Sequence, residues 1–341
     1  MSNLRKLVGV FAGLLALTLV AAACSSNNNS GGGGSASAGG DLTGSLNISG
    51  SSTVEPITSL VAENFQSANP GVDVAVDGPG TTDGFALFCK GQTDINDASR
   101  LIADDEKAAC ASGGVDYIEL AIGRDALTVV GNPSNSLDCL SLGDLYALFG
   151  PESQGFTNWS DANQLAKQVG GNGGFPNEPL TIVAPGQESG TYGSFIDLAT
   201  KSIADAQGQD PDDVLRPDYQ ISADDNVIIQ NAEGTAGGLG FVGFSYAQFA
   251  GNKIKEFKID NGGGCVAPSA ATVNDGTYPL GRTLYIYVSK EALASSPALK
   301  AFVDYYLSEA GIKAVTDVKY IALPSAELQQ SRSTWQSATA A

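Results

Sequence analysis

The sequence contains no histidine, and its 18 lysines and arginines stand against 37 aspartates and glutamates. Without histidine, Ser-His-Asp and Cys-His catalysis are excluded. No CxxC pair is present either, so we expect no bound metal. A cofactor is not expected. The formal charge of −19 argues against nucleic acid as a partner and against docking on anionic lipid through basic patches.

Long apolar runs are also absent, except for Leu7 to Ala23 near the N-terminus, which follows Arg5 and Lys6. This run is short for a membrane span and has the layout of a secretory signal, so residues 1–23 are predicted to be a signal peptide. Small residues leading to the lone Cys24 resemble a bacterial lipoprotein cleavage box, although Ala21 stands where such boxes more often have leucine. We therefore expect lipid on Cys24; the alternative is a secreted protein with a free Cys24.

The stretch after Cys24, SSNNNSGGGGSASAGG, has no apolar residue larger than alanine. Such a segment cannot bury enough surface to order itself, so residues 24–41 are predicted to be a flexible tether. The folded part would then lie outside the cell, anchored by lipid to the outer face of the cytoplasmic membrane. The remaining residues, about 300, are enough for two domains.

Four further cysteines follow, at Cys89, Cys110, Cys139 and Cys265. An even number in an exported chain indicates two disulfides, for which three pairings are possible. We favour Cys89–Cys110 as a local bridge and Cys139–Cys265 as a long-range one.

Strand-like and helix-like segments alternate from residue 44 onward. The segments GSLNISG, VDVAVDG and TDINDASR read as strands, and helical spacing of apolar residues separates the first two. A later strand, RTLYIYVS, precedes the helical pattern of ALKAFVDYYLSEAG. This alternation predicts an α/β fold with a mostly parallel sheet covered by helices, and no internal repeat is visible.

Three of the strand-to-helix junctions are rich in glycine and hydroxyl side chains: ISGSSTVEPI, DGPGTTDGF and TIVAPGQESGTYGSF. For one junction, helix capping is a sufficient explanation, since Ser52 and Glu55 fit the capping-box spacing. Helix capping is a weaker explanation when three junctions share the same composition. Because helix N-termini offer free N–H groups and a positive dipole end, three of them aimed at one point would form an anion cradle without lysine.

At these residues the sequence resembles the PstS-type phosphate-binding lipoproteins of bacterial ABC importers. The resemblance covers most of the chain after residue 42 and rests on an ordered set: GSSTVEPI, GPGTTDGF, FCKGQTDINDASR, ESGTYGSF, GLGFVGFSYA and YPLGRTLYIYV. It implies a two-lobe, type II periplasmic-binding-protein-like fold with the ligand in a cleft between the lobes. The two segments expected to cross between the lobes are ALTVVGN near residue 129 and RTLYIYV near residue 284. They place lobe I at 42–128 and 285–341 and lobe II at 129–284.

The resemblance also implies that inorganic phosphate is held by backbone amides and hydroxyls at helix starts, and that an ABC permease receives it from a monomeric protein. The residues that correspond to the family's ligands here are Ser52, Thr53, Val54, Thr81, Ser189, Gly190 and Thr191. Two departures concern charge. Pro185 stands where well-known members have an arginine, and Arg100 stands where they have an aspartate.

Arg100 follows a predicted strand, where α/β sheets place ligands, so it is our candidate for the missing phosphate clamp. The alternative is a surface salt bridge to Asp97 or Asp104. If phosphate is distinguished from sulfate by a carboxylate that accepts its proton, the nearest acids are Glu188 and Asp83.

Three other functions stay open at this point. The chain could bind another oxyanion such as sulfate, or serve as a surface or adhesion protein on the same fold. An enzyme is disfavoured, because Ser189 lacks both a G-x-S-x-G elbow and a lysine at S-x-x-K spacing.

Overall fold

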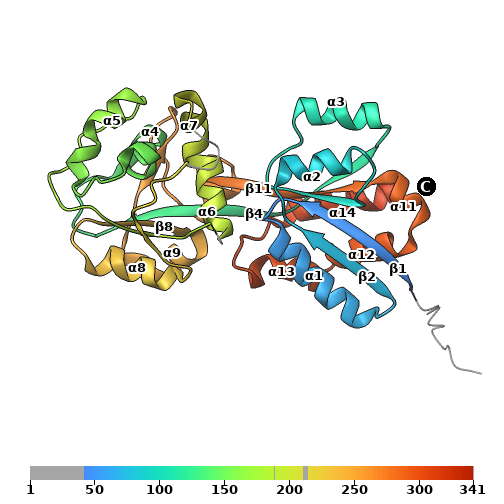
Figure 1. Cartoon of the computed structure of the whole chain (residues 1–341). Coiled ribbons are helices and arrows are strands. Elements are labelled where there is room, and N and C mark those ends of the chain that lie inside the picture. Colours follow the sequence, from blue (N-terminus) through green and yellow to red (C-terminus); the bar gives the residue numbers. More distant parts are fainter. Residues whose placement is uncertain (1–41, 188, 210–213, 341) are drawn as a thin grey trace, which may run out of the picture. The chain divides into compact units, whose positions relative to one another are not determined.

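The N-terminal part of the folded chain alternates strands and helices, as the sequence predicts. The computed structural model describes residues 42–187, 189–209 and 214–340. The predicted signal peptide, the tether and Cys24 lie outside these residues. In chain order the first elements are β1 (Gly44–Gly50), α1 (Glu55–Ala68), β2 (Val72–Asp77), α2 (Thr81–Phe88), β3 (Ile95–Ala98), α3 (Asp104–Gly113) and β4 (Tyr117–Gly131) (Figure 1).

The middle and last parts of the chain continue this alternation with shorter strands. The middle elements are β5 (Cys139–Ser141), α4 (Leu142–Phe149), η1 (Pro151–Ser153), η2 (Trp159–Ala162), α5 (Asn163–Gln168), β6 (Thr181–Ala184), α6 (Gly190–Phe195), η3 (Ile196–Thr200), α7 (Lys201–Gln207), β7 (Gln220–Ile221) and α8 (Asp225–Gly234). The last are β8 (Gly238–Gly243), α9 (Phe244–Ala250), η4 (Gly251–Lys253), β9 (Lys255–Glu256), β10 (Lys258–Asp260), α10 (Ala270–Asn274), β11 (Gly281–Ser289), α11 (Lys290–Ser295), α12 (Pro297–Tyr306), α13 (Glu309–Asp317) and α14 (Ser325–Thr339).

The main sheet has the strand order β2-β1-β3-β11-β4-β8-β6-β7, and β9 also pairs with β4. Its two ends are parallel: β1 pairs in parallel with β2 and β3, and β6 does so with β7 and β8. The centre is antiparallel, because β11 runs against β3 and β4, and β4 runs against β8. The expectation of a mostly parallel sheet was therefore wrong for the central strands.

Two large apolar clusters lie on different stretches of the chain. One draws on residues between Leu46 and Ile122 and between Leu284 and Trp335, and the other on residues between Ala126 and Leu280. The strand β4 contributes to both, since it pairs with β11 up to Ala126 and with β8 from Leu127 onward. Figure 1 shows β4 and β11 side by side where the two groups of helices meet. The lobe boundaries given above stay a prediction.

The first glycine-rich junction is shaped by the close approach of β3. A Cβ on Gly50, whose φ is 142°, would lie 2.1 Å from the carbonyl oxygen of Asp97, so glycine is required there. The chain then turns through Ser51, whose carbonyl accepts the N–H groups of Val54 and Glu55 at 3.0 and 2.9 Å. The N-cap of α1 is Val54, without a side-chain cap, so the capping-box explanation of Ser52 was wrong.

Both favoured disulfides are present, Cys89–Cys110 and Cys139–Cys265. The first joins the end of α2 to α3, and the second joins the start of β5 to the loop after β10. Across the described parts of the chain, no helix has both the length and the apolar character needed to cross a membrane. The same described residues contain no grouping of three or more acidic or cysteine side chains suited to a metal ion.

Candidate functional site

The first two glycine- and hydroxyl-rich turns meet at one cavity of about 870 Å³. Ser52 and Thr53 line it from the turn before α1, and Thr81 and Asp83 line it from the first turn of α2. The carboxyl ends of the parallel strands β1 and β2 precede these turns, which explains why two distant sequence motifs meet. Two of the three predicted turns therefore meet at the expected edge of the sheet; that they bind an anion stays a prediction.

On this side of the cavity, the hydroxyl groups of Thr81 and Ser99 are within hydrogen-bond distance of each other. The Thr81 hydroxyl lies 3.2 Å from the Ser99 hydroxyl and accepts the Ser99 N–H at 3.2 Å. Val54, in contrast, is fully buried, and its N–H donates to the Ser51 carbonyl. An anion could use the Val54 amide only by sharing or opening that hydrogen bond.

The third glycine- and hydroxyl-rich turn, which precedes α6, lies close to the first turn but lines a different, smaller cavity. The Ser189 hydroxyl caps α6 by accepting the Thr191 N–H at 3.1 Å. Gly190 is close to the first turn, since a Cβ placed on it would lie 3.9 Å from the Ser52 carbonyl oxygen. Gly190 and Thr191 line a smaller cavity of about 200 Å³, which they share with Asp125. Glu188 lies outside the described residues.

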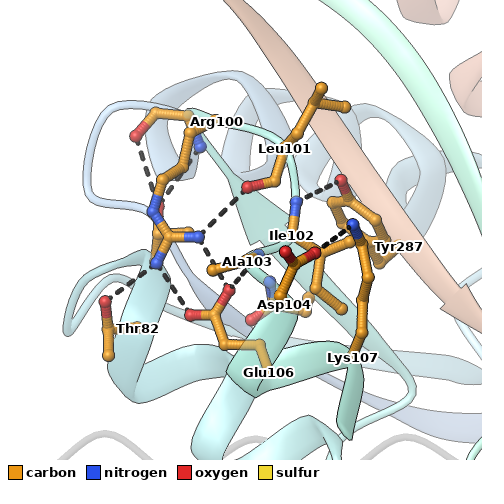
Figure 2. Close-up of polar contacts among 12 residues, drawn as sticks. Thr82, Arg100, Leu101, Ile102, Ala103, Asp104, Glu106, Lys107 and Tyr287 are labelled. Atoms are coloured by element: carbon orange, nitrogen blue, oxygen red, sulfur yellow. Dashed lines mark hydrogen bonds and ion pairs between the residues drawn. The ribbon is translucent and has the colours of Figure 1, made fainter.

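Arg100 reaches the large cavity, but its guanidinium already holds a carboxylate. Figure 2 shows both of its terminal nitrogens on Glu106, at 2.7 Å each, and Nη2 also donates to the Thr82 hydroxyl at 3.0 Å. The side chain is 41% exposed. The salt-bridge alternative named the wrong partners, because Asp104 pairs with Lys107 and Asp97 is buried. That Arg100 also binds the ligand stays a prediction.

A second arginine, Arg282, also lines the large cavity and was not singled out from the sequence. Its side chain is only 10% exposed. Nη2 donates to the hydroxyls of Ser194 and Thr53 at 2.7 and 2.9 Å, and so joins α6 to the turn before α1. Arg282 thus supplies a planar cationic donor group at the junction of the first turn and the third-turn helix.

Two carboxylates hold Arg282 in place. Asp125 lies directly opposite Arg282 in the antiparallel pair of β4 and β11, and its Oδ2 accepts Nε at 3.3 Å and the Ser194 hydroxyl at 2.7 Å. Asp197 accepts Nη1 at 3.0 Å. Asp125 is buried, whereas the Asp197 side chain is 50% exposed. The guanidinium is therefore supported from behind by one acid and covered toward the cavity by another.

Known proteins resemble this chain over most of its length. Residues 35–310 match the PBP superfamily domain. The chain is 40% identical to Protein SphX of Synechococcus elongatus over 279 residues, which is 81% of this chain and 77% of that protein. It is 30% identical to the phosphate-binding protein PstS of Staphylococcus saprophyticus over 292 residues, 85% of this chain and 84% of that one.

This chain belongs to the PBP superfamily, in the family of SphX and PstS. A solved structure agrees: a possible phosphate binding protein from Planctomyces limnophilus superposes with a TM-score of 0.76 at 31% identity, covering 87% of this chain and 99% of that one. The family resemblance and the two-lobe α/β fold class predicted from the sequence are thereby confirmed.

The first half of this PBP superfamily member contains one acid, Asp97, whose burial affects its charge. Asp97, on β3, is 1% exposed, and no described residue meets hydrogen-bond geometry with either of its carboxylate oxygens. Burial raises the pKa of Asp97 to about 8, and the negative charge of Glu55 adds to this, while the Thr58 hydroxyl opposes it. At neutral pH the group is therefore mostly protonated, which avoids placing a bare negative charge beneath the turn that contributes Thr53.

We expect Asp97→Asn to stabilise the fold increasingly as pH rises. The folded protein keeps a proton on Asp97 up to about pH 8, whereas the unfolded chain releases it near pH 4, so stability falls by up to about 1.4 kcal/mol per pH unit between these values. The amide variant lacks this loss. Its advantage in urea unfolding should grow by about 2–3 kcal/mol between pH 4.5 and 7.

The control is Asp73→Asn, an exposed carboxylate on β2. Its stability should follow that of the wild type over the whole range. A constant difference between Asp97→Asn and wild type from pH 4.5 to 7 would show that Asp97 ionises normally in the folded protein.

Proposed function

We propose that this protein binds inorganic phosphate outside the cytoplasm and delivers it to an ABC import permease. The observation that carries the proposal is the buried guanidinium of Arg282, a residue of the cavity wall. It donates to the hydroxyl of Thr53, which also lines the cavity, and to the hydroxyl of Ser194. A planar guanidinium with neighbouring hydroxyl donors suits a tetrahedral oxyanion, because it offers several directed N–H and O–H groups. The name of one relative, the phosphate-binding protein PstS of Staphylococcus saprophyticus, supports the same ligand.

The proposed ligand set combines the sequence predictions with the cavity. Arg282 would supply the main positive charge, and Arg100 a second one after release from Glu106. The hydroxyls and amides would come from the three turns: Ser52, Thr53, Val54, Thr81, Ser189, Gly190 and Thr191. Asp83, which lines the cavity, and Glu188 are the proposed proton acceptors that would favour phosphate over sulfate.

We further propose a monomer held by lipid on Cys24, without catalytic activity. The absence of histidine from the whole sequence supports a binding role over Ser-His-Asp or Cys-His chemistry. Two alternatives have specific consequences: a sulfate-type oxyanion binder would prefer sulfate, and an adhesion protein would bind neither anion.

Isothermal titration of the purified protein with orthophosphate and with sulfate separates these readings. We expect one phosphate per protein with a Kd of about 1 μM or tighter, equivalent to about −8.2 kcal/mol. Sulfate should bind at least tenfold more weakly. Preference for sulfate would support the other-oxyanion alternative, and no heat with either anion would contradict the proposed function.

Ser189→Ala should weaken phosphate binding by about 1–3 kcal/mol, because a charged acceptor would lose one donor. The substitution also removes the cap of α6, since Ser189 accepts the Thr191 N–H. Ser269→Ala is the matched control, because Ser269 caps α10 in the same way and accepts the Thr272 N–H at 3.1 Å. The control should lose stability only. Equal phosphate affinity in both variants and wild type would remove the third turn from the site.

A further inference from the structure

We propose that Asp197 sets the ligand affinity of this site by covering the guanidinium of Arg282, so that an incoming anion must displace it. The inference rests on the proposed function, since the anion used to test it is phosphate. It concerns a residue that neither the turn motifs nor the family resemblance indicates.

The hydrogen bonds of Arg282 identify Asp197 as the partner that can leave. Of the four partners that Arg282 has among the described residues, three, namely Thr53, Asp125 and Ser194, are at least 94% buried. Only Asp197 is half exposed, and its side chain and that of Arg282 both line the large cavity. The Asp197–Arg282 contact therefore borders the cavity through a half-exposed partner, whereas the other three partners are buried.

Charge makes displacement necessary. Asp125 and Asp197 together carry two negative charges against the single positive charge of Arg282. An anion placed beside this group would be repelled as long as both carboxylates stay in contact with the guanidinium. If Asp197 moves away, the Nη1 donor becomes available and one negative charge leaves the binding surface.

Asp197 lies on an irregular turn of its helix. Asp197 lies in η3, a π-helical turn at Ile196–Thr200 between α6 and α7. Single π turns are rare and occur frequently at functional sites. Lys201, four residues along, also lines the cavity and pairs with Asp205, so it does not neutralise Asp197 in this arrangement.

The test compares wild type, Asp197→Asn and Asp138→Asn by titration with inorganic phosphate. Asp138 is the control, since it is an exposed acid that pairs with Lys258 and does not line the cavity. Asp197→Asn should bind phosphate at least threefold more tightly than wild type, and Asp138→Asn should match wild type. Unchanged or weaker binding in Asp197→Asn overturns the proposal; weaker binding would indicate that Asp197 contacts the ligand as an acceptor.

A second measurement needs no phosphate and keeps the two proposals apart. Phenylglyoxal modifies accessible arginines, and the modified peptides are quantified by mass spectrometry. Arg282 should react faster in Asp197→Asn than in wild type, while Arg216, which pairs with Asp218, should react equally in both. Wild-type protein that gives no heat with phosphate contradicts the proposed function, and the labelling then decides whether Asp197 covers Arg282. Equal labelling of Arg282 in wild type and Asp197→Asn would contradict the proposal that Asp197 covers its guanidinium.

Discussion

Arg282→Ala is expected to weaken phosphate binding by about 3–5 kcal/mol, roughly two to four orders of magnitude in Kd. The variant removes the buried cation of the cavity wall and leaves the ligand to hydroxyls, backbone dipoles and the proposed second cation, Arg100, which Glu106 holds. It also leaves Asp125, which is 5% exposed, without its cationic partner. Arg282→Lys keeps the charge but loses the planar fork, so it should cost less, about 1–2 kcal/mol. Isothermal titration with phosphate measures both variants.

Arg216→Ala is the matched control for this loss. Arg216 is also a buried arginine, with 5% of its side chain exposed and Asp218 as its partner, but it does not line the cavity. It should reduce stability and leave the affinity unchanged. Arg100→Ala is the informative comparison, because Glu106 already occupies the Arg100 guanidinium. A larger loss of affinity in Arg100→Ala than in Arg282→Ala would assign the main positive charge to Arg100.

The second large effect concerns stability and the bridge between Cys139 and Cys265. This bridge closes a sequence separation of 126 residues, against 21 for Cys89–Cys110. Since the entropy removed from the unfolded chain grows with loop length, Cys139→Ala/Cys265→Ala should lower the free energy of unfolding by about 4–5 kcal/mol. The corresponding loop-entropy effect for the shorter bridge is about 3 kcal/mol.

Guanidinium unfolding of the double variants, monitored by circular dichroism, measures these losses. Replacing both partners of a bridge leaves no new free thiol, so changes in oxidation state do not enter the comparison. If Cys139→Ala/Cys265→Ala unfolds at the same denaturant concentration as wild type, the long-range bridge does not constrain the unfolded chain.

The parallel parts of the fold were predictable because their signals are local. The junction at Gly50 combines an apolar strand, a required glycine and an apolar helix face within a few residues, and the structure places β1 and α1 there. The second junction behaves in the same way, with α2 beginning at Thr81. These local patterns explain why two of the predicted turns meet at one cavity.

The antiparallel centre was not predictable in this way. β11 begins at Gly281, yet it lies between β3 and β4, so its partners are far away in the sequence. Nothing local to RTLYIYVS indicates strand direction. The helical pattern beyond it was also read as one helix, whereas the chain breaks after α12 and restarts when the Ser308 hydroxyl accepts the Gly311 N–H and caps α13.

At the site, the contacts of Arg100 and Arg282 also depend on tertiary pairing that local sequence patterns do not reveal. Arg100 was placed beside the cavity from its strand position, but its partner depends on α3, where Glu106 bonds the Ala103 N–H and faces the guanidinium. Arg282 was overlooked, because its role depends on the pairing of β11 with β4 opposite Asp125. Its one sequence signal is a basic residue at the entry to an apolar strand in a chain with few bases.

The most direct test of the account is a crystal structure of the protein grown with orthophosphate. The account predicts one phosphate in the large cavity, with oxygens within hydrogen-bond distance of the Arg282 guanidinium and the hydroxyls of Thr53 and Thr81. In that structure Asp197 should have left Nη1 of Arg282. Phosphate bound away from Arg282, with the contact between Asp197 and Arg282 intact, would contradict it.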